Sequence, residues 1–146
     1  MTTATTFDRA APPAATAARA ASGRQRLAGR ILSGLAIAFL LFDSVGKVAG
    51  LAPAVEGTVQ LGYPASTLLG IGLLQLGCLL LYAVPRTAVL GALLLTGYLG
   101  GAVATHVRVG NPLFSHTLFP IYVAALLWGA INLRDPRLRI LLPVRG

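Results

Sequence analysis

Two charged side chains, Asp43 and Lys47, lie four residues apart in the first long apolar stretch of this chain. This spacing places both on one face of a helix, and the order with the acid first favours an ion pair. Because a charge in an apolar segment is costly, such a pair is also a candidate for function. We therefore predict a structural ion pair near the helix end. The alternative is a group that faces the protein interior and binds a proton or an anionic headgroup.

A second polar cluster follows the third apolar stretch, in the segment THVRVGNPLFSHT. Its candidate ligand- or partner-binding residues are His106, Arg108, Asn111 and His116. The Gly-Asn-Pro turn at residues 110–112 allows the segment to fold back, which would bring His106 and His116 close to each other.

Two histidines could bind a metal or haem, but such sites usually need a third or fourth protein ligand. Only Asp43 and Glu56 are available on that side of the chain. We therefore predict no metal site, and haem remains an alternative. We expect a polar cap instead, with Arg108 touching lipid phosphate or Glu56 and the histidines at helix ends.

A third candidate is Gln75, an amide near the middle of the second apolar stretch. Cys78 and Tyr82 follow three and seven residues later, so the three share one helix face. This pattern predicts a buried hydrogen bond between helices. The same groups, with Tyr98 opposite, could also form a pocket for a quinone-like headgroup.

The composition indicates a membrane protein. The chain has 146 residues, of which 55% are apolar and only 11% charged, whereas soluble domains carry about 25% charged residues. This argues against a typical soluble enzyme, and the abundance of Leu, Ile and Val argues against a disordered chain. The single cysteine cannot form an internal disulfide.

Four apolar stretches are each close to the length of one membrane-spanning helix. They cover residues 31–49, 66–84, 87–105 and 117–133. We predict an all-α integral membrane domain over residues 28–143, folded as a four-helix up-down-up-down bundle. The Ala-, Thr- and Pro-rich basic segment 1–27 is expected to be a disordered cytoplasmic tail.

The basic residues predict the orientation of this bundle. Ten of the twelve lie before the first stretch, between the second and third, or after the last. Positive charge concentrates on the cytoplasmic side, so both termini are expected there. We predict no nucleic-acid partner, because no basic stripe with interleaved aromatic residues occurs.

Small residues in the third stretch predict close helix packing. Gly97, Gly101 and Thr105 recur at four-residue spacing, which gives a smooth stripe of the kind that membrane helices pack against. We expect packing within the chain, and a homodimer through Gly97 and Gly101 is the alternative.

Several motifs resemble those of the DoxX-like family of small bacterial membrane proteins. They are LxPxVxxxxxLGYP at residues 51–64, YxxPRT at 82–87, LLTGYLGGAVATHVRVGNPLFSHTLFP at 94–120 and WGAINLRDPRLR at 128–139. The resemblance covers about residues 28–143 and implies a four-helix protein of the bacterial cytoplasmic membrane. It carries over as candidate positions Asp43, Lys47, His106, Arg108, Asn111 and His116.

The family name derives from a subunit of a membrane thiosulfate:quinone oxidoreductase, and some relatives look like accessory or assembly factors. We therefore expect a non-catalytic subunit or accessory factor of a membrane redox or envelope complex, in contact with the bilayer and a partner membrane protein. The alternative is a component of a membrane oxidoreductase that binds quinone or haem itself. A small transporter or channel is the third possibility. No set of catalytic residues is identifiable.

Overall fold

The computed structural model describes residues 23–135, and all secondary structure in this range is helical. The elements are α1 (Gly23–Val48), α2 (Ala52–Gln60), α3 (Thr67–Ala83), α4 (Ala88–Arg108), the π-helical turn η1 (Leu113–Thr117) and α5 (Phe119–Arg134). The expectation of an all-α chain is confirmed. Three segments are long and apolar enough to cross a membrane, Gly23–Val48, Ala88–Arg108 and Leu113–Arg134, and α3 is a shorter apolar helix.

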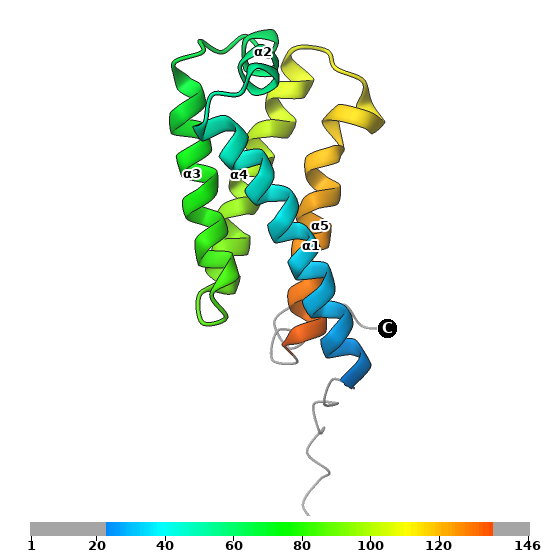
Figure 1. The fold of residues 1–146 in the computed structure, drawn as a ribbon. Helices are drawn as coiled ribbons and strands as arrows, with labels where there is room; N and C mark the ends of the chain where they lie inside the picture. The colour runs from blue at the N-terminus through cyan, green and yellow to red at the C-terminus, as the bar shows by residue number, and fades with distance from the viewer. Residues whose placement is uncertain (1–22, 136–146) are drawn as a thin grey trace, which may run out of the picture.

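The four long helices lie alongside one another, and the short α2 covers one end (Figure 1). α1 contacts both α3 and α5, and α4 contacts the same two helices. α3 and α4 form an antiparallel hairpin around Pro85, and α1 runs obliquely past its neighbours (Figure 1). The first and last described residues lie at the same end of the molecule (Figure 1).

α1 begins at Gly23, eight residues before the expected start at Ile31. The last five residues of the predicted tail, 23–27, are therefore helical, and residues 1–22 lie outside the described range. The extra turns are supported from α5, because a Cβ on Gly29 would lie only 2.8 Å from the carbonyl oxygen of Ala130. Residues 136–143, the predicted end of the domain, are also outside the described range.

Two elements that the sequence did not predict occupy the connections at the α2 end. α2 has Pro53 in its first turn, where a missing N–H costs nothing. Gly62, with φ of 81°, lets the chain reverse just after this helix. The π-helical turn follows Pro112, where the amides of His116 and Thr117 both donate to the Pro112 carbonyl.

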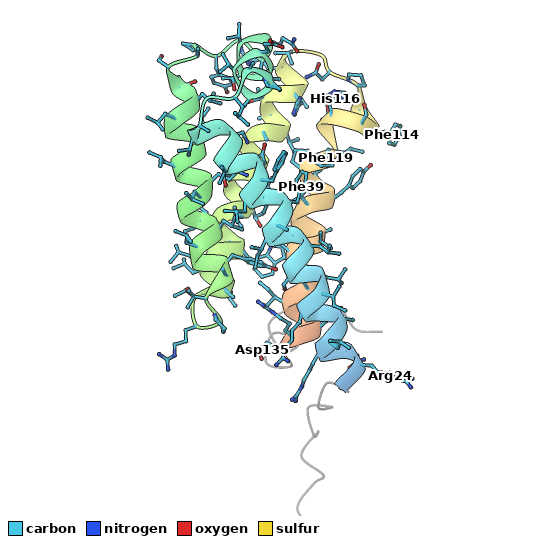
Figure 2. All side chains as sticks on the ribbon, in the orientation of Figure 1. Arg24, Phe39, Phe114, His116, Phe119 and Asp135 are labelled. Carbon is cyan, nitrogen blue, oxygen red and sulfur yellow. The ribbon has the colours of Figure 1, made fainter. Side chains whose placement is uncertain are left out.

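The core is a narrow apolar seam between the long helices. Its largest fully buried apolar side chains are Leu40, Tyr82, Leu95 and Leu127. Large apolar side chains also cover the outside, such as Phe42 at 78% exposure, and Figure 2 shows side chains projecting all along the bundle. An apolar exterior of this kind suits contact with lipid tails.

Glycines lie where the helices approach each other most closely, but they are not the glycines that the sequence predicted. Cβ atoms built on Gly29, Gly72 and Gly91 would meet atoms of α5, α1 and α3 within 3 Å. Cβ atoms built on Gly97 and Gly101 would meet nothing within 4 Å. The two glycines of the predicted stripe therefore make no close helix contact among the described residues, whereas Thr105, its third member, is buried and bonds Tyr63 within the chain.

Candidate functional site

Four polar side chains from three helices form one hydrogen-bonded cluster around Lys47. The Lys47 ammonium donates to Asp43 Oδ2 at 2.5 Å, to Gln75 Oε1 at 2.8 Å and to Tyr98 Oη at 3.2 Å. These residues are two from α1, one from α3 and one from α4. We call them the Lys47 cluster: Asp43, Lys47, Gln75 and Tyr98.

The cluster is closed by bonds among the other members. Gln75 Nε2 donates to Asp43 Oδ2 at 2.8 Å and to the Leu40 carbonyl at 3.3 Å. Tyr98 Oη donates to Gln75 Oε1 at 2.8 Å. Gln75 is fully buried, and its amide has partners at both ends. Buried polar groups satisfied in this way fix the positions of the helices that carry them.

A glycine lets this cluster form. A Cβ on Gly72 would lie 2.9 Å from the Cβ of Lys47, so a larger residue there would force α1 and α3 apart. Gln75 lies three residues later on the same face of α3, one turn nearer the centre of the bundle. The missing side chain at Gly72 thus brings Gln75 within reach of Asp43 and Lys47.

Lys47 and Tyr98 also line a cavity of about 450 Å³. Its polar lining comes from Lys47, Thr58, Tyr63, Tyr98, Thr105 and His106. Gly97 and Gly101 lie in the same wall, where the absence of a side chain leaves open space. Asp43 and Gln75 do not line the cavity. They accept hydrogen bonds from Lys47 and Tyr98 and so fix the positions of these two side chains.

The connection between α2 and α3 completes the cavity. Tyr63 Oη hydrogen-bonds Thr105 Oγ1 at 2.9 Å, which ties the connection to α4. Arg108 donates to the Leu61 carbonyl at 2.6 Å, and its guanidinium lies 5.5 Å from the centre of the Tyr63 ring. Arg108 therefore holds this connection in place. Its hydrogen bond goes to the Leu61 carbonyl and not to Glu56, one of the two partners expected for it besides lipid phosphate.

The two histidines lie close together, as the turn residues predicted. The ring centroids of His106 and His116 are 6.0 Å apart, in an edge-to-face arrangement. His106 Nδ1 hydrogen-bonds the Asn111 amide at 2.8 Å, and His116 Nδ1 hydrogen-bonds the Ser115 hydroxyl at 2.8 Å. Among the described residues no group of three His, Cys, Asp or Glu side chains is placed to hold a metal.

The structure thus divides the sequence-predicted residues into two groups. Asp43, Lys47 and Gln75 meet in the Lys47 cluster, and His106 joins them at the cavity. Three others, Arg108, Asn111 and His116, lie outside the cavity wall and support the connections around it. Figure 2 shows His116 at the opposite end of the molecule from Arg24 and Asp135.

Sequence reasoning assigned no role to Tyr63 or Thr58, which both line the cavity. The only signal was the LGYP turn at residues 61–64, which carries Tyr63 but says nothing of its neighbours. The position of Tyr63 depends on α2, which the sequence did not predict.

A family model described as the DoxX-like family matches residues 31–130. The matched range contains the whole Lys47 cluster and, within the described part of the chain, every residue that lines the cavity. No curated protein and no solved structure matches the chain.

Proposed function

The chain belongs to the DoxX-like family, and we propose that it is a non-catalytic membrane subunit of a redox complex that holds a quinone headgroup in the cavity beside Lys47. The family and the apolar helices indicate a membrane protein. The observation that carries the proposal is the Lys47 ammonium, fixed by three partners and placed on the wall of a 450 Å³ cavity.

We propose that all four long helices cross the bacterial cytoplasmic membrane as an up-down-up-down bundle. α3 has 17 residues and is about 26 Å long, at the lower limit for a membrane span. The positive charge of the chain supports cytoplasmic termini, because Arg86 and the arginines at the start of α1 and the end of α5 lie opposite the Lys47 end.

The chemistry of the cavity suits a quinone. A quinone ring carries two carbonyl oxygens on opposite sides, and each accepts hydrogen bonds. The Lys47 ammonium gives one level of the cavity a positive charge, and a carbonyl oxygen there would take the N–H group that donates to Tyr98 Oη, the longest of its three bonds at 3.2 Å. His106 lies on the cavity wall eight residues beyond Tyr98 along α4. Eight residues correspond to a rise of about 12 Å along the helix axis, so His106 stands at a separate level of the cavity, where it would meet the second carbonyl oxygen.

The remaining walls favour a flat, apolar ring. Gly97 and Gly101 present bare backbone, while Ile71 and Leu74 supply apolar surface from α3. A mostly apolar pocket with a few convergent polar groups is typical of small-molecule sites. The alternative haem site would use both histidines, but only His106 lines the cavity, so the quinone is the better-supported ligand.

Two neighbouring glycines provide a matched test. Gly101 lines the cavity and Gly100 does not, yet a Cβ on either meets nothing within 4 Å. We expect Gly101→Leu to fill the cavity and lower bound quinone at least about tenfold, because the ligand and the new side chain compete for one space. Gly100→Leu should retain the ligand.

The measurement is quinone extracted per mole of full-length protein, purified in mild detergent from native membranes. Binding of added decylubiquinone is measured on the same samples. The absence of bound quinone together with no binding of decylubiquinone would overturn the proposal, as would equal retention by the two variants. A change in native mass with Gly101→Leu alone, at unchanged quinone, would instead assign the stripe to a homodimer.

A further inference from the structure

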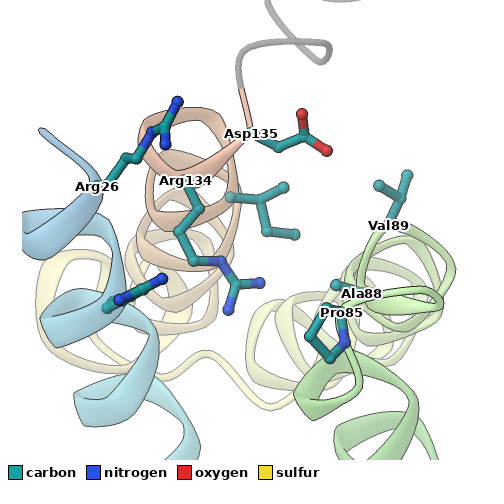
Figure 3. Close-up of a pocket in the computed structure, with 8 residues that line it drawn as sticks. Arg26, Pro85, Ala88, Val89, Arg134 and Asp135 are labelled. Atoms are coloured by element: carbon teal, nitrogen blue, oxygen red, sulfur yellow. The ribbon is translucent and has the colours of Figure 1, made fainter. Parts of the chain in front are cut away.

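A second pocket, of about 300 Å³, lies at the end of the bundle opposite the Lys47 cluster. Three arginines line it, Arg26 and Arg30 from α1 and Arg134 from the last turn of α5. Figure 3 shows Arg26 and Arg134 on one side of this pocket and the α3–α4 turn with Pro85 on the other. Nothing in the proposed quinone site uses these residues.

The fold holds the arginines together. Arg26 and Arg30 are four residues apart and so share one face of α1. Gly29, between them, lets the end of α5 approach, since a Cβ there would lie 2.9 Å from the Cγ of Arg134. α1 and α5 therefore bring their positive charges to one place.

Arg134 is also oriented by a buried tyrosine. Its guanidinium lies 5.7 Å from the centre of the Tyr82 ring, in a cation–π contact. The Tyr82 hydroxyl is fixed in turn by the Leu127 carbonyl at 3.2 Å and by Ser33 Oγ at 3.3 Å. The arginine is thus held over the pocket before any ligand arrives, which lowers the entropic cost of binding.

The pocket carries excess positive charge. Among residues 23–135 its lining holds one carboxylate, Asp135, against three arginines. Like charges held close together repel each other, and an anion between them relieves that repulsion. Planar guanidinium groups match the oxygens of a phosphate, which they can bind through two hydrogen bonds each.

We propose that this pocket binds a phosphate group, with the headgroup of an anionic lipid as its source. The pocket lies at one end of an apolar bundle, where lipid headgroups are located, and basic pockets between membrane helices favour such lipids. Its lining includes the apolar side chains of Ala88, Val89 and Ile131, which suit the less polar part of a lipid next to its phosphate.

The test is native mass spectrometry of the full-length protein in detergent, titrated with phosphatidylglycerol, phosphatidylcholine and inorganic phosphate. We expect phosphatidylglycerol to bind with one dominant site. Arg30→Gln and Arg134→Gln should each weaken it about fivefold to tenfold, the effect of one arginine near an anionic headgroup. The matched control is Arg24→Gln, which removes the same charge from α1 outside the pocket lining.

Arg134→Gln also removes the contact with Tyr82, so Arg30→Gln is the variant that tests the pocket without touching that contact. Equal binding of phosphatidylglycerol and phosphatidylcholine would overturn the proposal, as would a loss with Arg24→Gln as large as with Arg30→Gln. If inorganic phosphate displaces the lipid at similar concentration and depends on the same arginines, the phosphate site stands and the lipid source is overturned.

Discussion

Alanine at Gly91 is expected to destabilise the protein, although alanine is the better helix former. A Cβ at this position would meet the backbone nitrogen of Tyr82 and lie 2.5 Å from its Cα. Because backbone atoms cannot rotate away, α3 and α4 must separate. Overpacking of this kind costs about 1–3 kcal/mol, and a backbone contact belongs at the upper end. Helix propensity returns up to about 1 kcal/mol, which leaves a net loss of about 2 kcal/mol.

The matched control is Gly100→Ala, in the same helix but with no atom within 4 Å of the added Cβ. It should gain up to about 1 kcal/mol from helix propensity alone. The assay is reversible unfolding in mixed micelles by increasing SDS, followed by helical circular dichroism. If the protein with Gly91→Ala unfolds at the same or a higher SDS fraction than that with Gly100→Ala, the inferred close approach of α3 and α4 is incorrect.

Two further substitutions test separate hydrogen bonds. Tyr82→Phe removes the hydroxyl that bonds the Leu127 carbonyl. In the same SDS titration its free energy of unfolding should be lower by about 1–2 kcal/mol, and an unchanged midpoint would contradict this role. Arg108→Ala removes the bond to the Leu61 carbonyl and the contact with the Tyr63 ring. Amide hydrogen exchange in residues 61–66 should then become several times faster while global stability falls by less than about 1 kcal/mol, and unaltered exchange would argue against this role.

The long helices could be predicted because each is a continuous apolar stretch with a clear break. Pro85 predicted the turn of the α3–α4 hairpin, and the structure places it there. α2 escaped prediction because its nine residues include Pro53, Glu56 and Gly57, which look like loop residues. The early start of α1 also escaped prediction, because its support comes from α5, far away in the sequence.

The candidate site was predictable mostly within single helices; the exception is the buried hydrogen bond expected from Gln75 to another helix, which Tyr98 makes. The Asp43–Lys47 ion pair follows from a spacing of four residues, and it is present. The joining of Gln75 to this pair depends on how closely α1 and α3 approach at Gly72. A spacing along one helix carries no information on the distance between two helices, so the Asp43–Lys47 pair and Gln75 looked separate in the sequence.

The unequal lengths of α1 and α3 have a consequence for the surrounding bilayer. At 1.5 Å per residue, the 26 residues of α1 extend about 39 Å and the 17 residues of α3 about 26 Å. The first eight residues of α1 include Arg24, Arg26 and Arg30, which belong at the headgroup level, so its apolar part, residues 31–48, extends only about 27 Å. In the proposed four-span arrangement both helices are shorter than a hydrocarbon core of about 30 Å, so the membrane should be locally compressed, most of all on the α3 side. The protein should accordingly be more stable in vesicles with short acyl chains than in those with long ones.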